Sequence, residues 1–401
     1  MKPIYFLLFG LAALFILNGC RGQAIKEAPE STSNIAQQIG GGCDGCELMY
    51  VGIPNELSSI HTSSGWVEGN HKLIVTGRVF QLDGKTPAPN IIVYYWHTDE
   101  HGLYSSDQHV PKEALRHGKL RGWVKSDENG NYTIQTSRPA AYPNENIPQH
   151  IHLSIKEKEL SEYYADLYFD DDPLYLPHQK KYGKSDRAGT ELLRVLKHDK
   201  HEVAEHNIIL GLNIPNYPIA IIPAIASGLN IGEDQPSFTP FHAFGPDKGT
   251  ATCPVCKYGR YHGILYFVGA QPHWDEIKRW LRFLEAESIK REKYLKAYFV
   301  YGNAHRESKE VLQLQLEKIG RELQLQKVAL TFVPDFSDEE SEVNLNKINP
   351  AASNTIIIYR HRTIIDKYVN LQPTEANFKL ISEVLNSTKS DSFEWQESSH
   401  P

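Results

Sequence analysis

Two histidines separated by one residue offer the clearest chemistry in this chain. His150 and His152 lie in the stretch NENIPQHIHLSI, residues 144–155, at the start of an apolar run. The run predicts a β-strand, in which residues i and i+2 point to the same face. Two imidazoles on one face can share a metal ion, although a lone pair of this kind is also found without any ligand. The rest of the chain must therefore supply further donors if the pair binds a metal.

Two tyrosines upstream of the pair are the candidate donors. Tyr104 follows a glycine turn in YYWHTDEHGLYSSD, and Tyr142 lies in SRPAAYPNENIPQH. The motifs W-H-T-D-x-x-G-x-Y, D-x-x-G-x-Y-T, R-P-x-x-Y-P and H-I-H follow one another in this order. Their order resembles the intradiol ring-cleavage dioxygenases, and most closely the protocatechuate type and its small exported bacterial relatives. The resemblance runs from about Leu73 to Tyr217 and includes LYFDDDP at 167–173.

The resemblance implies a ferric site with four protein ligands, which are Tyr104, Tyr142, His150 and His152. A bound cation of high charge deprotonates its ligands, and two phenolates favour Fe(III) over Fe(II). In this family the iron acts as Lewis acid and template while O₂ cleaves a catechol-type diol between its hydroxyls to a diacid. The axial tyrosine, here Tyr142, is expected to leave the metal and accept a substrate proton.

The chain departs from the family at two positions. Ile147 stands where catechol-cleaving members have an arginine, three residues before the first histidine, and Asp166 replaces the Gln or Arg before LYF. Loss of a preorganised charge of this kind costs about 10²–10³ in rate. Four residues are candidates for the replacement charge: Arg116, His117, Arg121 and Arg138.

The predicted catalytic residues are Tyr142, Arg138 and Gln149. For Arg138 the alternative is a salt bridge or a contact to a phenolate, and for Gln149 it is a side chain that faces solvent rather than the pocket. Other polar residues are not assigned to the predicted site. Tyr94 and Tyr95 are expected to lie in a strand, one in the core and one at the surface, rather than to bind the metal. Residues 170–172 are expected to form a solvated acidic loop, with a calcium site as the outside alternative. Three histidines are expected to be solvated: His198, His201 and His206.

The elements around these motifs predict a mixed protein of two domains. Short strands with turn signals over residues 43–217 predict an all-β sandwich. The Pro- and Gly-rich residues 218–250 are predicted to form a linker. Residues 251–389 have the order β-α-β-α-β-β-β-α, with amphipathic helices around 273–291 and 308–325, which predicts an α/β domain. This order resembles the thioredoxin fold. Residues 390–401 are expected to be a disordered tail.

Length and charge narrow the class of protein. A chain of 401 residues favours two folded units, and its net charge of −7 offers no basic face for nucleic acid. Oligomeric state is left open, with a homo-oligomer as one option.

The N-terminus predicts export. MKPIYFLLFGLAALFILNGC, residues 1–20, has a basic residue and an apolar core shorter than a membrane span, as a signal peptide does. Its end resembles the lipobox of bacterial lipoproteins, which implies acylation of Cys20, a lipid anchor in a membrane of the cell envelope and a flexible tether over residues 21–42. The alternative is a plain secretory signal.

Four further cysteines form two C-x-x-C pairs. Cys43 and Cys46 are expected to form a local disulfide in an oxidising compartment. Cys253 and Cys256 form a redox-type motif, but it precedes the strand at 263–270, whereas an active thioredoxin has its pair after the first strand. A structural disulfide, a docking site for a partner, or a zinc site shared by all four cysteines are the alternatives.

Three hypotheses for function follow. The first is an envelope-anchored Fe(III) dioxygenase that acts on an aromatic diol and O₂. The second, favoured by Ile147, is a non-catalytic envelope lipoprotein that binds a metal or a catecholate. The third is a thiol–disulfide module in the C-terminal half.

Overall fold

The computed structural model describes residues 39–43, 45–218, 226–269, 271–303 and 307–397. The predicted signal peptide, Cys20 and most of the predicted tether lie outside these residues. Residues 36–401 form one compact unit. Among the described residues, no helix has both the length and the apolar character needed to cross a membrane.

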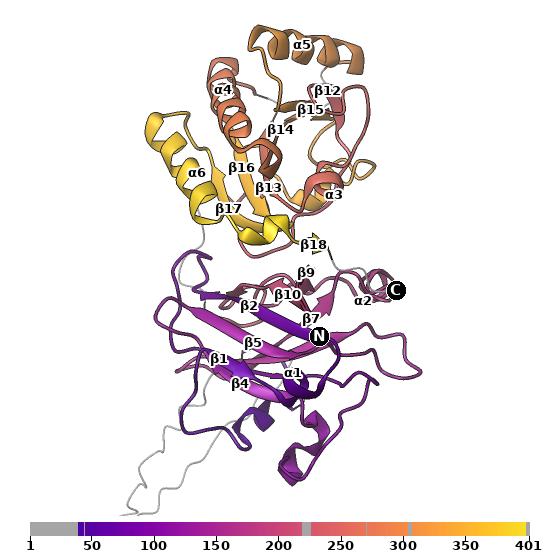
Figure 1. The fold of residues 1–401 in the computed structure, drawn as a ribbon. Coiled ribbons are helices and arrows are strands. Elements are labelled where there is room, and N and C mark those ends of the chain that lie inside the picture. The colour runs from indigo at the N-terminus through magenta and orange to yellow at the C-terminus, as the bar shows by residue number, and fades with distance from the viewer. Residues whose placement is uncertain (1–38, 44, 219–225, 270, 304–306, 398–401) are drawn as a thin grey trace, which may run out of the picture. The chain divides into compact units, whose positions relative to one another are not determined.

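Two sheets are built mainly from residues 60–209 (Figure 1). The first has the order β1 (Ile60–Thr62), β5 (Asn131–Ser137), β2 (Lys72–Phe80), β10 (His201–Glu205), β9 (Val195–His198) and β18 (Gln396–Glu397), and β11 (Ile208–Ile209) also pairs with β2. The second has the order β4 (Arg121–Lys125), β3 (Ile92–Trp96), β6 (His150–Lys156), β7 (Tyr163–Phe169) and β8 (Leu192–Leu193). Two short helices accompany them, α1 (Ser64–Glu68) and α2 (Tyr175–Tyr182).

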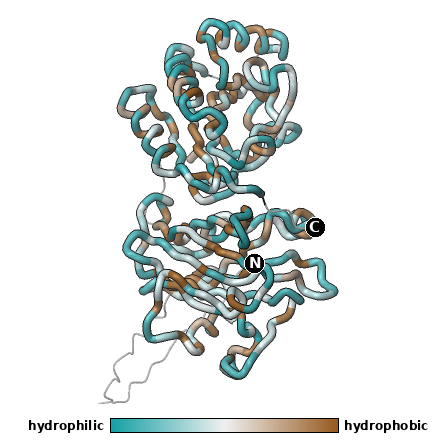
Figure 2. Tube along the Cα trace, in the orientation of Figure 1, coloured by the Kyte–Doolittle hydropathy of each residue, from teal (hydrophilic) through white to brown (hydrophobic). Residues whose placement is uncertain are grey.

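The two sheets share one hydrophobic core, as in the predicted sandwich. Alternate residues of each strand point into it: Val75 of β2, Ile134 of β5, Val93 of β3 and Leu153 of β6 are each at most 1% exposed. The intervening residues point away from the core. Figure 2 shows hydrophobic residues gathered along these strands. The side of a strand on which a polar residue falls is therefore fixed by its register.

The sequence prediction finds β2, β3, β4, β5 and β6 of the two sheets. The predicted last strand at 207–215 is reduced to Ile208–Ile209, and β1, β7, β8, β9, β10 and β18 were not predicted. Strands β9 and β10 are short and contain His198 and His201 beside lysines and acids, so their sequences show no apolar alternation. Their pairing with each other and with β2 supplies the order that local propensity lacks.

His206 was expected to be solvated, and this prediction is wrong. The side chain is 2% exposed. Its Nε2 lies 3.0 Å from the Thr190 carbonyl oxygen, and its Nδ1 lies 3.1 Å from the Tyr132 hydroxyl. Both ring nitrogens thus have partners inside the fold, which is what allows the burial of a polar ring.

The third sheet comes from residues 241–369 and has the order β12 (Phe241–Phe244), β15 (Ala329–Val333), β14 (Leu295–Gly302), β13 (His262–Val268), β16 (Thr355–Arg360) and β17 (Thr363–Val369). Strands β13, β14 and β15 are parallel, and β16 and β17 are antiparallel to their neighbours. Four helices accompany it: α3 (Pro254–Tyr258), α4 (Trp274–Arg291), α5 (Lys309–Glu322) and α6 (Glu375–Ser387). From β13 onward the element order is the predicted one. The resemblance to the thioredoxin fold stays a prediction.

Apolar residues at helical spacing bury one face of each long helix. Leu281 of α4, Leu316 of α5 and Leu385 of α6 are at most 1% exposed, in one cluster with Phe299 of β14. The opposite face of the sheet is covered in part by the segment predicted as a linker, through Leu229 and Phe238. That segment also supplies β12, so residues 226–250 belong to the fold.

The chain end from 390 to 397 differs from the predicted disordered tail. It forms a short 3-10 helix, Asp391–Glu394, and the strand β18, which pairs with β9. Phe393 is 3% exposed and packs against the rings of Tyr261 and His262. One buried aromatic side chain outweighs the polar composition around it.

Both cysteine pairs form local disulfides, Cys43–Cys46 and Cys253–Cys256, so the four sulfurs do not share a zinc ion. The second pair lies at α3, before β13 in the chain. A redox role for it stays a prediction.

We expect the burial of His206 to make stability depend on pH. Burial lowers its pKa from 6.5 to about 4. Between these values the unfolded chain binds a proton that the folded state does not, so the free energy of unfolding falls as the pH falls from 6.5 toward 4, by up to about 1.4 kcal/mol per pH unit. Urea unfolding at about pH 7 and pH 5 measures the loss of free energy of unfolding between these two pH values. The loss should be smaller for His206→Gln than for wild type. The exposed His109→Gln should keep the wild-type difference, and equal slopes in all three proteins would contradict the assignment.

Candidate metal centre

The four predicted ligands converge on one point. The hydroxyl oxygens of Tyr104 and Tyr142 lie 2.6 Å apart, and the Nε2 atoms of His150 and His152 lie 3.1 Å apart. Tyr142 oxygen is 3.1 Å from His150 Nε2 and 3.5 Å from His152 Nε2, and Tyr104 oxygen is 3.1 Å from His152 Nε2. Two oxygens and two nitrogens thus surround a space of the size that one metal ion takes.

Strand register places the histidines on the outer face of the second sheet. In β6, Ile151 and Leu153 enter the sandwich core, so His150 and His152 point the other way. Strand β3 pairs with β6 so that Trp96 lies opposite His152. Its ring stacks on the His152 imidazole with centroids 4.9 Å apart. The indole therefore covers one side of the ligand ring and limits its rotation.

A hydrogen-bonded loop holds Tyr104. The Oδ1 atom of Asp99 accepts from the backbone N–H groups of His101 at 2.9 Å and Leu103 at 3.0 Å, and its Oδ2 accepts from the Ser105 hydroxyl. A side-chain oxygen that caps successive N–H groups fixes a turn without secondary structure. Asp99 thus fixes the loop in which Tyr104 supplies the chemistry.

The two tyrosine loops are tied to each other. The Thr98 hydroxyl donates to the Ala140 carbonyl at 2.7 Å, and the Ala140 N–H donates to the Asp99 carbonyl at 3.0 Å. Gly102 has φ +76°, and a Cβ there would lie 2.1 Å from the Ala141 carbonyl oxygen. Only glycine permits this approach. These contacts bring Tyr142 to Tyr104.

The Nδ1 atoms of His150 and His152 bond to other residues, so the Nε2 atoms of both rings face the tyrosines. His150 Nδ1 donates to the Pro148 carbonyl at 2.7 Å, and His152 Nδ1 lies 2.6 Å from Asp166 Oδ1. Asp166 comes from β7, directly opposite His152 in the pairing with β6. Such partners fix the tautomer and orientation of histidines that bind metals. The sequence showed Asp166 only as a departure from the family, and the position opposite His152 in a β6–β7 hairpin is the signal that could have found it.

Without a metal, the His150 imidazole and both tyrosine phenols are neutral near pH 7. Burial and the neighbouring His152 lower the pKa of His150 to about 4, so its ring is neutral near pH 7. Burial raises the pKa of both phenols, and the Tyr142 hydrogen bond raises that of Tyr104 further. Metal binding must therefore displace the phenol protons.

The donor set fits a hard cation of high charge. Within the described ranges, no three His, Cys, Asp or Glu residues cluster in a way that could hold a metal ion. A metal site here therefore depends on the two phenol oxygens. Phenolate oxygens with two imidazoles differ from the Cys, His and carboxylate sets typical of zinc.

Arg138 and Gln149 are not directed at the cluster. Arg138 has a side chain only 2% exposed and forms ion pairs with Asp171 and, at 3.3 Å, with Glu202. Its Nε donates to Gln149 Oε1 at 2.8 Å. The structure thus shows the salt bridge that was the alternative for Arg138, and Gln149 serves that network rather than a pocket or bulk solvent.

The other candidates for a replacement charge also have partners elsewhere. Arg116 forms an ion pair with Glu47 at 3.0 Å, and Arg121 donates to the Val51 carbonyl. His117 bonds to the Tyr94 hydroxyl at 2.8 Å and stacks on Trp96. His117 is therefore one aromatic ring away from His152.

The remaining predictions divide. Tyr94 and Tyr95 lie in a strand as predicted, but both are fully buried, so the expected surface position of one of them is wrong. The acidic run 170–172 is not simply solvated, because Asp171 pairs with Arg138 and Asp172 accepts from the Gln149 and Leu174 N–H groups. His198 and His201 are half-buried and contact the rings of Trp395 and Trp66.

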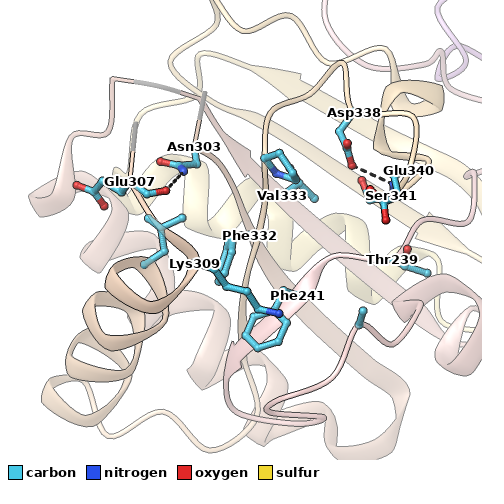
Figure 3. A pocket seen from close by; sticks show the side chains of 13 residues that line it. Thr239, Phe241, Asn303, Glu307, Lys309, Phe332, Val333, Asp338, Glu340 and Ser341 are labelled. Atoms are coloured by element: carbon cyan, nitrogen blue, oxygen red, sulfur yellow. Dashed lines mark hydrogen bonds between the residues drawn. The ribbon is translucent and has the colours of Figure 1, made fainter. Parts of the chain in front are cut away.

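A cavity of about 580 Å³ lies away from this cluster, at the ends of β14 and β15 (Figure 3). Phe241 and Phe332 line it, together with polar groups that include Asn303 and Ser341. None of the four predicted ligands is among its lining residues.

Comparison with known proteins shows that part of the chain is similar to dioxygenases. Residues 54–207 match the family model described as Dioxygenase. Catechol 1,2-dioxygenase of Acinetobacter baylyi is 34% identical over 96 residues, 24% of this chain and 30% of that protein. The protocatechuate 3,4-dioxygenase beta chain of Burkholderia cepacia is 35% identical over 112 residues, 26% of this chain and 46% of that protein. The chain thus spans less than half the length of these relatives.

Solved structures give weaker similarity. The dioxygenase domain of a dioxygenase and carbohydrate-binding fusion from a Streptomyces species has 21% identity and a TM-score of 0.30, over 39% of this chain and 91% of that one. Hydroxyquinol 1,2-dioxygenase from Pseudomonas putida has 20% identity and a TM-score of 0.30, over 45% and 68%.

We expect Asp166→Asn to weaken metal binding by about 10- to 100-fold, because His152 loses the carboxylate that fixes its tautomer. Titration of the metal-free protein with Fe(III), followed by tryptophan fluorescence, would measure this. Glu159→Gln removes a carboxylate that is 83% exposed in the loop between β6 and β7, and should leave affinity unchanged. Equal affinity in the Asp166→Asn variant would contradict the role.

Proposed function

We propose, from the premise that residues 54–207 belong to the intradiol ring-cleavage dioxygenase family, that this protein is an envelope-anchored non-haem Fe(III) dioxygenase. Its substrates would be a catechol-type aromatic diol, cleaved between its hydroxyls, and O₂. The proposal depends on one observation: Tyr104, Tyr142, His150 and His152 present two oxygens and two nitrogens, and five of the six distances between these atoms are 2.6–3.5 Å.

The four ligand residues would hold the iron, and hydrogen bonds from neighbouring residues orient them. The Nδ1 bonds to the Pro148 carbonyl and to Asp166 aim both imidazoles, while Asp99 and Thr98 fix the tyrosine loops. Bound iron would supply Lewis acidity and a template for the diol. Side chains positioned before binding lose little freedom when the metal enters.

Tyr142 is the candidate proton acceptor. Its oxygen lies beside Tyr104 oxygen and His150 Nε2, at 2.6 and 3.1 Å. A phenolate released from a metal is a strong base, since the phenol pKa is about 10 in water and burial raises it here. Tyr142 Oη could therefore take a proton from a bound diol hydroxyl.

The location rests on the first 20 residues. The apolar segment 4–17 and the ending Leu17-Asn18-Gly19-Cys20 support export and acylation at Cys20. A single acyl chain gives weak membrane binding, so stable anchoring takes more than one chain. Two C-x-x-C pairs that form disulfides agree with an oxidising compartment.

A second candidate function is a non-catalytic envelope protein that binds a metal or a catecholate. Ile147 favours it, since the family's arginine is absent there and Arg138 is held in ion pairs with Asp171 and Glu202. The ligand set would then serve affinity alone.

Metal content and colour test the proposed site. Two tyrosinate bonds should give the iron-loaded protein a burgundy colour, and catechol under air should shift the absorption and consume O₂. Tyr104→Phe should weaken and shift the absorption, because one charge-transfer donor is lost. Tyr168→Phe is the matched control, since its ring lies 5.8 Å from that of His150 but it is not a predicted ligand. A colourless iron-loaded protein would contradict the ligand assignment.

Position 147 separates the two candidate functions. If the chain cleaves catechols slowly for want of the arginine, Ile147→Arg should raise the rate of O₂ uptake by about 10- to 100-fold, since a preorganised charge at an active site is worth this much or more. Asn146→Arg places the same charge on the exposed neighbouring residue and should have little effect. Catechol binding without O₂ uptake in either variant would favour the binding protein.

A further inference from the structure

A second cavity, of about 420 Å³, is lined mainly by basic side chains and lies inside the unit 36–401. None of the four predicted metal ligands lines it. Its charged side chains are four basic ones against two acidic ones: Arg194, Lys257, Arg260 and Arg362, with Asp170 and Asp171.

Five buried nitrogen atoms at this cavity have no hydrogen-bond partner within the described part of the chain. They are Nε and Nη1 of Arg194, Nε and Nη2 of Arg260, and Nε2 of His361. A buried donor without a partner is costly, and a buried charge without one is more costly still. Such groups are rare in folded proteins, and a cluster of them calls for a ligand.

Two of the acidic residues nearby are already engaged, and burial raises the pKa of the third, Asp170, although Arg194 and Arg362 act on it in the opposite direction. Asp171 accepts from both terminal nitrogens of Arg138. Asp234 takes one nitrogen of Arg194 and also pairs with Lys184. The Arg260 side chain forms no hydrogen bond or ion pair among the residues described, so its charge is the least compensated at the cavity.

The hairpin that carries His361 and Arg362 is strained. These two residues are the turn between β16 and β17, with φ of +48° and +61°. Such turns take Asn and Gly, because other side chains adopt positive φ at a cost. Strain of this kind persists where the surrounding structure demands it, often at a binding site.

We propose that this cavity is a binding site for an oxyanion group, of the phosphate or carboxylate class. The Nε and Nη2 atoms of one guanidinium form a planar edge that matches two oxygens of such a group, and Arg260 has both free. Arg194 supplies two further donors. His361 adds a neutral imidazole, because burial and its arginine neighbours lower its pKa well below the ordinary value, and a neutral imidazole can donate one hydrogen bond.

Thermal unfolding of the purified protein in inorganic phosphate, against chloride at equal ionic strength, tests the site. Wild type should gain a saturable rise in Tm, because a ligand that binds the folded state stabilises it. Arg260→Gln should weaken phosphate binding by about 10- to 100-fold, as expected for lost hydrogen bonds to a charged group. Its Tm in chloride should equal or exceed that of wild type, since an unpaired buried charge is removed. Adipate in place of phosphate distinguishes a carboxylate site from a phosphate site.

Arg282→Gln is the matched control, because it removes the same charge from an exposed position on α4. It should respond to phosphate as wild type does. The proposal fails if neither anion raises the Tm of wild type, or if Arg260→Gln keeps the full response. It also fails if Arg260→Gln lowers Tm equally in chloride and phosphate, which would make Arg260 a structural residue. None of these outcomes depends on iron or on ring cleavage.

Discussion

The pairing of β6 between β3 and β7 is the constraint on which the candidate metal centre depends. It sends Ile151 and Leu153 into the sandwich core and His150 and His152 to the opposite face. A slip by one residue would bury both imidazoles and expose the core residues. The same register sets Trp96 against one face of His152 and Asp166 against its Nδ1. Core packing therefore decides ligand geometry, although no ligand takes part in the core.

The tyrosines need a different device, because neither lies in a strand. Asp99 caps the loop of Tyr104, and Thr98 and Asp99 bond to Ala140, three residues after the end of β5 and two before Tyr142. These hydrogen bonds fix the backbone of the two loops, as strand pairing fixes the backbone in a sheet. Gly102 then allows the two loops to touch. The motif residues around each tyrosine thus serve mainly to hold the two phenols in position.

The region beyond residue 218 is joined to the same compact unit and brings chemistry of its own. It supplies Arg260, His361 and Arg362 to a cavity where Arg194, from the loop between β8 and β9, contributes the remaining free donors. Buried donors that find no partner among the described residues are hard to explain by stability, since replacing a buried charge by a neutral group is often stabilising. A binding role explains both the unpaired donors and the strained turn. It would also give the C-terminal region a purpose that does not need a redox-active cysteine pair.

The sequence alone determined the ligand types and much of the fold. Four motifs in order pointed to two phenols and two imidazoles, and alternation along 150–156 put the histidines on one face. Apolar spacing also found the helices α4 and α5. Tertiary structure decided what depends on contacts between distant residues. Arg138 forms ion pairs because the fold brings it to Asp171, in the turn after β7, and to Glu202 of β10, and Asp166 became a partner of His152 only through the β6–β7 register. His206 and Phe393 look solvated in a polar sequence, yet are buried by strands and rings remote in the chain. Local patterns specify which face a residue takes, whereas the partner that satisfies a buried charge or polar group is set by which segments the fold brings together.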